Sequence, residues 1–172
     1  MTHMVIRREQ PADHEAVYQV VKEAFANAEH TDGREQDLVA ALRKSRAFIP
    51  ELSLVAVENE QIAGHILFTR AVVNQTEVLA LAPLSVLPAY RGRGIGLSLI
   101  AKGHKIAAEL GYQYSVVLGH ANYYPKAGYI PASRYGIKAP FEVNDENFMA
   151  ICFGENINKL DGIIEYDKAF GI

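Results

Sequence analysis

The stretch Arg91-Gly92-Arg93-Gly94-Ile95-Gly96 decides the fold, because it separates an apolar run typical of a strand from an apolar run typical of a helix. Three glycines in six residues let the backbone approach an anion closely and adopt φ values that a Cβ atom would forbid. The following helix adds unsatisfied N–H groups and the positive end of its dipole. The sequence therefore predicts a turn that binds a pyrophosphate through main-chain amides. A plain tight turn is the alternative, but it needs fewer glycines and no flanking arginines.

The segments around this turn predict a mixed sheet. Three β-rich runs precede it, at Leu52 to Val57, Ile62 to Val73 and Val78 to Val86. Short polar turns separate these runs, so antiparallel pairing is expected. After the turn, helical spacing of apolar residues predicts a helix from Ile95 to Leu110, which Gly111 ends. A strand from Tyr114 to Leu118 follows, and the resulting right-handed crossover implies parallel pairing with the strand before the turn.

The two ends of the chain add flanking elements. A short strand is expected from Val5 to Arg7, a helix beginning at Pro11, and a second helix from Arg34 to Lys44. Late strands are expected from Phe148 to Phe153 and from Gly162 to Tyr166. The fold class is therefore α+β, with a mixed central β-sheet flanked by helices. The polar segment from Gly136 to Glu146 is expected to form a loop over the active site.

Composition limits the class of protein. The 172 residues are 49% hydrophobic and 22% charged, which predicts one globular domain over residues 1–172. A net charge of −3 disfavours nucleic acid or an anionic membrane as the main partner. The charged first ten residues are not typical of a signal peptide, and no apolar run is long enough to span a bilayer. Cys152 is the only cysteine, so a buried apolar role and a cytoplasmic setting are expected.

Two common phosphate loops do not match the glycine stretch. A dinucleotide loop has the pattern G-x-G-x-x-G, but the sixth position is Leu97 when the pattern starts at Gly92 and Leu99 when it starts at Gly94. The G-K-[S/T] step of a nucleoside triphosphate loop is also missing. Antiparallel runs before the loop do not belong to a doubly wound fold. Nucleotide-binding folds are therefore disfavoured, and no histidine or cysteine spacing indicates a metal site.

Two motifs of the chain carry a family resemblance. The first is Leu84-Ser85-Val86, followed by Pro88, Tyr90 and the pattern R-x-x-G-x-G, and the second is Tyr123-Tyr124-Pro125-Lys126-Ala127-Gly128-Tyr129. The first resembles the acetyl-CoA motif of the GNAT superfamily of N-acetyltransferases, and the second is similar to the second motif of that superfamily. Weaker matches extend over almost the whole chain to a small bacterial single-domain subgroup. The resemblance implies a GNAT-like fold and acetyl-CoA as the acetyl donor.

The resemblance also implies which residues bind the donor. Its pantetheine arm would pair like an extra strand with Leu84, Ser85 and Val86. Pro83 fits a disrupted ladder there, although a proline on an edge strand is an equal alternative. The pyrophosphate would lie on the glycine turn and the first helical turn, which comprise Arg91, Gly92, Arg93, Gly94, Ile95, Gly96, Leu97 and Ser98. Arg91 or Arg93 would neutralise outer phosphate oxygens.

The implied chemistry is direct attack of a primary amine on the thioester in a ternary complex, with an amide near Val86 polarising the carbonyl. By motif match, Tyr124 is the general acid that protonates the leaving thiolate. A tyrosine that only packs over the cofactor is the alternative. The base that deprotonates the amine is either a side chain or a water relay. The candidate side chains are Glu35, which could equally be a solvated helix residue, and His120, which could equally be a histidine that only forms hydrogen bonds within a loop.

The expected partners are acetyl-CoA and an amine that the sequence does not identify, and a homodimer is one arrangement that the sequence allows. A competing hypothesis is a non-catalytic acyl-CoA-binding sensor, which would use the same loop but leave Tyr124 idle. A third is a plain phosphate-binding scaffold.

Overall fold

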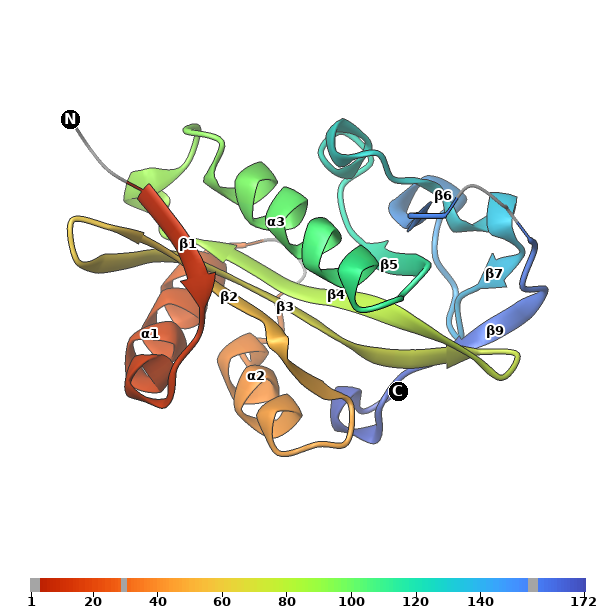
Figure 1. Cartoon of the computed structure of the whole chain (residues 1–172), viewed down its shortest axis with the longest axis horizontal. Helices are drawn as coiled ribbons and strands as arrows, with labels where there is room; N and C mark the ends of the chain where they lie inside the picture. Colours follow the sequence, from red (N-terminus) through yellow and green to blue (C-terminus); the bar gives the residue numbers. More distant parts are fainter. Residues whose placement is uncertain (1–3, 29–30, 155–157) are drawn as a thin grey trace.

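The computed structural model describes residues 4–28, 31–154 and 158–172 (Figure 1). Its strands are β1 (Met4–Arg8), β2 (Phe48–Glu58), β3 (Gln61–Val73), β4 (Thr76–Val86), β5 (Tyr114–Leu118), β6 (Ile130–Pro131), β7 (Ile137–Lys138), β8 (Phe148–Cys152) and β9 (Gly162–Glu165). Its α-helices are α1 (His14–Phe25), α2 (Glu35–Arg43) and α3 (Ile95–Glu109). Both predicted early helices are present, although the first turn after Gln10 is a 3-10 turn at Pro11–Asp13.

The strands form one mixed sheet with the order β1-β2-β3-β4-β5-β8-β6, and β9 pairs with the far end of β3. The hairpin turns fall at Asn59-Glu60 and Asn74-Gln75, where all four residues have positive φ. Such two-residue turns suit the twist of antiparallel strands, and β2, β3 and β4 pair antiparallel as expected. Pairing between β4 and β5 is parallel, which confirms the predicted crossover through α3.

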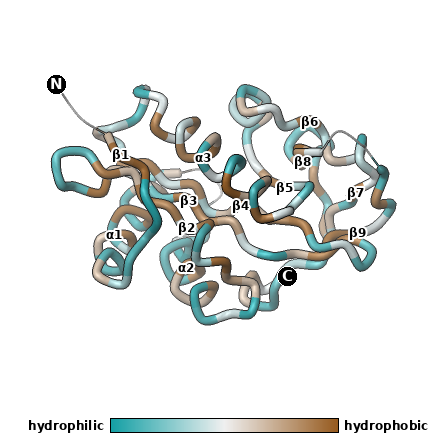
Figure 2. The backbone as a smooth tube through the Cα atoms, in the orientation of Figure 1, coloured by the Kyte–Doolittle hydropathy of each residue, from teal (hydrophilic) through white to brown (hydrophobic). Residues whose placement is uncertain are grey.

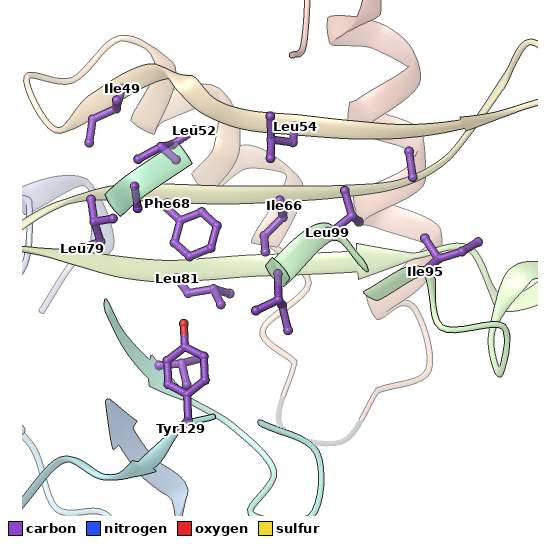
Figure 3. Packing of buried hydrophobic residues seen from close by; sticks show 14 of the residues in the cluster. Ile49, Leu52, Leu54, Ile66, Phe68, Leu79, Leu81, Ile95, Leu99 and Tyr129 are labelled. Atoms are coloured by element: carbon purple, nitrogen blue, oxygen red, sulfur yellow. The ribbon is translucent and has the colours of Figure 1, made fainter. Parts of the chain in front are cut away.

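Helices cover both faces of this sheet. Helix α3 lies on one face, and α1 and α2 lie on the other (Figure 1). On the first face, Leu99 of α3 packs among buried residues of the central strands such as Ile66 and Phe68 (Figure 3). On the second face, Val21 and Leu42 pack in a separate cluster. Hydrophobic residues accordingly concentrate along the central strands in Figure 2, whereas turns and helix ends are hydrophilic.

The central strands separate at one end, and this opening positions the site. β4 pairs with β5 only at Leu79 and Ala80. The register of β3 with β4 also shifts between the pairs that contain Leu81 and Leu84, so a bulge lies around Pro83. β4 lies between β3 and β5 in the strand order, but it has no pairing with β5 beyond Ala80. Pro83 therefore lies both at the bulge and on a stretch that is unpaired on the β5 side, and both interpretations stay open.

Some predicted boundaries differ from the structure. Strand β2 begins at Phe48, ahead of Pro50, because an irregular register between Phe48 and Ser53 requires no ladder N–H from the proline. Strand β8 ends at Cys152 and β9 at Glu165, each one residue before the expected end. Within the three described ranges, no helix combines the length and apolar character that crossing a membrane requires.

Candidate active site

A cleft of about 840 Å³ lies where β4 and β5 separate. The end of β4 and the first turn of α3 line one side, and the residues after β5 line another. The end of α1 and the start of α2 complete the wall. Eleven of the predicted site residues line this cleft together: Glu35, Leu84, Val86, Arg91, Gly92, Gly94, Ile95, Gly96, Leu97, His120 and Tyr124.

The glycine turn presents main-chain donors to the cleft. Gly94 is the N-cap residue of α3 and has a φ of 77°, in the left-handed region that favours glycine. The carbonyl of Gly94 accepts the first helical hydrogen bond, from the amide of Ser98 at 3.0 Å. The amides of Ile95, Gly96 and Leu97 have no acceptor among the residues that the structure describes. Three free donors at a helix N-terminus are the arrangement that an anion requires.

The two arginines of the turn have different partners. The Arg91 guanidinium lines the cleft and donates to the carbonyl oxygen of Ala24, at 2.7 Å, near the end of α1. The Arg93 side chain lies outside the cleft, where it forms an ion pair with the buried Glu58 carboxylate and stacks over the Tyr90 ring. Of the two candidates for neutralising phosphate oxygens, Arg91 alone therefore has its side chain at the cleft.

Two further predicted residues have side chains away from the cleft. Ser85 is 1% exposed and does not line the cleft, so it could contribute only through its main chain. Ser98 does not line the cleft either, and its amide is already hydrogen-bonded to the carbonyl of Gly94. The expectation of a loop over the site from Gly136 to Glu146 is wrong. Part of that segment, Ile137–Lys138, pairs with β9, and none of its residues lines the cleft.

Tyr124 begins the 3-10 helix Tyr124–Ala127 that follows β5, and its ring packs against two other tyrosine rings. Tyr123 packs edge-on against it with ring centroids 5.1 Å apart, and Tyr129 does so at 5.8 Å. A methyl group at Gly119 would overlap the Tyr124 ring, so the backbone contacts the ring directly there. Burial, together with the neighbouring Tyr123, raises the pKa of Tyr124 above its ordinary value, and the hydroxyl stays protonated at neutral pH.

The two candidate bases come from different parts of the chain. Glu35 is the first residue of α2, and its carboxylate accepts hydrogen bonds from the Thr31 hydroxyl, one of them at 3.0 Å. A second cavity of about 560 Å³ adjoins the cleft, and Glu35 lines both, together with Phe25 and Leu38. His120 follows β5 and lines the cleft from the side of Tyr124.

The structure adds residues that sequence reasoning did not select. Tyr123 and Lys126 line the cleft, as do the helix-end residues Ala24, Phe25 and Ala28. Tyr123 is itself part of the tyrosine pair of the second motif, so the motif could have identified it as a site residue. Helical spacing could not assign the end of α1 to a site, because it predicts only an apolar face. Among the side chains that the structure covers, no three His, Cys, Asp or Glu groups are arranged to bind a metal ion.

The chain belongs to the acetyltransferase (GNAT) family, because the family model matches residues 14–129. This match confirms the predicted superfamily and the predicted enzyme class, an acyltransferase.

Similar proteins are found over most or all of the chain. The N-acetyltransferase YjhQ of Escherichia coli K12 is 41% identical over 119 residues, which are 66% of this chain and 66% of YjhQ. A GNAT family acetyltransferase from Brucella melitensis, solved in complex with acetyl-CoA, is 34% identical, covers 98% of both chains and superposes with a TM-score of 0.82. YhbS from Escherichia coli, solved in complex with CoA, is 26% identical over 100% of this chain and 94% of its own, with a TM-score of 0.90. These two structures confirm the predicted fold class.

Proposed function

We propose that this protein transfers the acetyl group of acetyl-CoA to a primary amine by direct attack in a ternary complex. The observation that carries the proposal is the position of three free main-chain donors, at Ile95, Gly96 and Leu97, in the same cleft as the protonated hydroxyl of Tyr124. Family membership and the two solved relatives, which hold acetyl-CoA and CoA, support the choice of donor.

The donor would bind mainly through the backbone. Its pyrophosphate accepts hydrogen bonds from the first turn of α3, and Arg91 adds a positive charge at the wall of the cleft. Its pantetheine arm lies along β4 beyond Ala80, where that strand has no pairing with β5. The amide of Leu87 donates to Ala63 on the β3 side at 2.9 Å. Because successive strand residues point their N–H groups to opposite sides, the amide of Val86 faces the opening and can polarise the thioester carbonyl.

The reaction requires one acid and one base. The amine nitrogen attacks the carbonyl carbon, the tetrahedral intermediate collapses, and the C–S bond breaks. Tyr124 donates its proton to the sulfur as the thiolate leaves, and the base takes the proton that the amine loses. A carboxylate is suited to this second role, and Glu35 is our first assignment for the base because it lines both the cleft and the adjoining cavity. His120 is the alternative on the opposite wall.

We further propose that the acceptor amine enters through the second cavity. The carboxylates of Asp32, Glu35 and Asp37 line it beside apolar side chains such as Leu38 and Phe170, and they outnumber the lining cation, Arg34. This combination suits a cationic amine on an apolar stem, which would pass Glu35 before it reaches the thioester. We also expect a cytoplasmic setting, in line with the single cysteine, and a homodimer stays a prediction.

A panel of primary amines tests the proposal. The protein is mixed with acetyl-CoA and each amine, and release of free thiol is followed together with acetylated product. Turnover with at least one amine is expected. Tight binding of acetyl-CoA without turnover over a broad panel would instead favour the sensor hypothesis. Binding of coenzyme A no tighter than of an adenosine bisphosphate would favour a plain phosphate-binding scaffold.

A further inference from the structure

Tyr129 is anchored in the core by two side chains from different elements. Its side chain points toward the sheet in Figure 3, and the residue is 1% exposed. The hydroxyl lies 2.8 Å from Oγ of Ser115 on β5 and 2.9 Å from Nε2 of His104 on α3. Burial lowers the pKa of His104 to about 4, so its ring is neutral at physiological pH and can both donate and accept. The side chains of Ser115, Tyr129 and His104 thus form a small hydrogen-bonded network beside the hydrophobic core.

The ring of Tyr129 connects this network to the cleft. Its centroid lies 5.8 Å from that of Tyr124, with an angle of 79° between the ring planes. Such an edge-to-face contact defines both the distance and the tilt of the neighbouring ring. Tyr129 itself does not line the cleft. Its ring contact with Tyr124 therefore links it to a residue that lines the cleft.

Tyr124 is in contact on its other sides as well. The backbone of Gly119 lies against one edge of its ring, where a methyl group would overlap it. Tyr123 packs edge-on at 5.1 Å, with 88° between the ring planes. Contacts with Tyr129, Gly119 and Tyr123 thus leave the Tyr124 ring little freedom to tilt. Of these three neighbours, Tyr129 is the one whose own side chain is held by hydrogen bonds to Ser115 and His104.

We infer that Tyr129, anchored by Ser115 and His104, is a positioning residue that aligns the hydroxyl of Tyr124 with the thioester sulfur. The inference rests on the proposed function, in which Tyr124 is the acid. Proton transfer requires close alignment, and a displacement of about 1 Å can reduce a rate by as much as about 100-fold. Loss of the anchor lets the Tyr129 ring shift and the Tyr124 hydroxyl move with it, whereas the phosphate-binding turn is unaffected.

The variant Tyr129→Phe tests the anchor, since it keeps the ring and removes the hydroxyl. We expect kcat to fall about 10-fold while the KM for acetyl-CoA stays within about twofold of the wild-type value. The matched control is Tyr135→Phe, which alters a buried tyrosine that packs edge-on against Tyr114 at 5.5 Å in a separate cluster. The control should leave kcat unchanged. Thermal unfolding of both variants shows that each is folded at the assay temperature.

Coupling to Tyr124 distinguishes positioning from a general structural effect. In a Tyr124→Phe background, Tyr129→Phe should have no further effect on kcat, because no hydroxyl remains to be aligned. Two losses that multiply in the double variant would overturn the inference. So would a Tyr129→Phe enzyme with wild-type kcat when Tyr124→Phe alone is slow. If Tyr124→Phe itself has wild-type kcat, the proposed acid is wrong, which is a separate result.

A second variant covers the case in which Tyr129→Phe does not fold. Ser115→Ala removes one of the two anchors and leaves the ring and His104 in place. We expect a smaller reduction of kcat, about threefold, which again disappears in the Tyr124→Phe background. A Ser115→Ala enzyme with wild-type kcat, or a loss of kcat that persists in the Tyr124→Phe background, would overturn the inference.

Discussion

The hydroxyl of Tyr123 lies against the Cα atom of Gly96, so a methyl group at position 96 would overlap it. This contact joins the segment after β5 to the first turn of α3, which carries the free main-chain donors. The glycine is therefore required by a neighbouring side chain, in addition to any approach by a phosphate. The wall formed by the residues after β5 therefore contacts the wall formed by α3 at this point.

Gly96→Ala should weaken acetyl-CoA binding about 10-fold, which corresponds to about 1.4 kcal/mol, because the added methyl displaces Tyr123 or the helix start. Calorimetric titration measures the loss. The double variant Gly96→Ala/Tyr123→Phe should recover most of the affinity, since without the hydroxyl the nearest atom is the ring Cζ at 3.4 Å from the new Cβ. Absence of recovery would show that the methyl collides with the ligand itself.

Gly94→Val should abolish tight binding of acetyl-CoA, because a β-branched side chain intrudes where the pyrophosphate approaches. Gly111→Val is the matched control. Both glycines have positive φ, at 77° and 94°, both flank α3, and a Cβ at either position would meet nothing within 4 Å. The two variants should lose similar stability, and Gly94→Val alone should lose affinity. Equal affinities would contradict the assignment of the turn.

Tyr124→Phe should lower kcat about 10- to 1000-fold while acetyl-CoA affinity stays near the wild-type value, because the hydroxyl assists the leaving group and does not bind the donor. Steady-state kinetics and direct binding measure the two quantities separately. An unchanged kcat would assign Tyr124 a packing role only.

The base can be identified from pH–rate profiles of Glu35→Gln and His120→Asn. A general base must be deprotonated, so the rate falls as pH decreases through its pKa. We expect Glu35→Gln to remove the acidic limb of the kcat/KM profile and His120→Asn to retain it. The reverse pattern would assign the role to His120, and retention of the limb in both variants would indicate a water relay.

Stability should decrease as pH falls from about 6.5 toward 4, because the buried His65 and the partly buried His104 are neutral in the folded state. Burial lowers the pKa of His65 to about 4, although Glu9 opposes this shift, and burial has the same effect on His104. In this interval the unfolded chain binds protons that the folded chain does not. The unfolding free energy should therefore fall by up to about 1.4 kcal/mol per pH unit for each histidine.

Urea unfolding between about pH 7 and pH 5 measures this slope. His104→Gln keeps a hydrogen-bonding side chain beside Tyr129 but cannot titrate in this interval, so its slope should be about half that of the wild type. A variant with the wild-type slope would show that His104 titrates normally in the folded protein.

Local sequence patterns predict the position of the glycine turn, which is the proposed phosphate-binding part of the cleft. Gly94 and Gly96 identify the turn because backbone geometry there depends on residues that are adjacent in the chain. The hairpins and the crossover follow from periodicity and turn length for the same reason.

Features that depend on distant residues were not predictable in this way. Arg93, one of the two alternatives for neutralising phosphate oxygens, pairs with Glu58, and the contact of Tyr129 with Ser115 and His104 joins residues from three segments. The segment from Gly136 was assigned to the wrong place because its pairing partner, β9, lies more than twenty residues further along the chain. No local pattern encodes such pairings.

Main-chain donors at the start of α3 have an evolutionary consequence. An amide N–H is present whatever side chain its residue carries, apart from proline, so mutations around the turn can accumulate while the diphosphate contacts persist, provided that the glycines remain. Divergence would then be concentrated in the walls that receive the acceptor, so related enzymes can acquire new amines without rebuilding the part that carries the acetyl group.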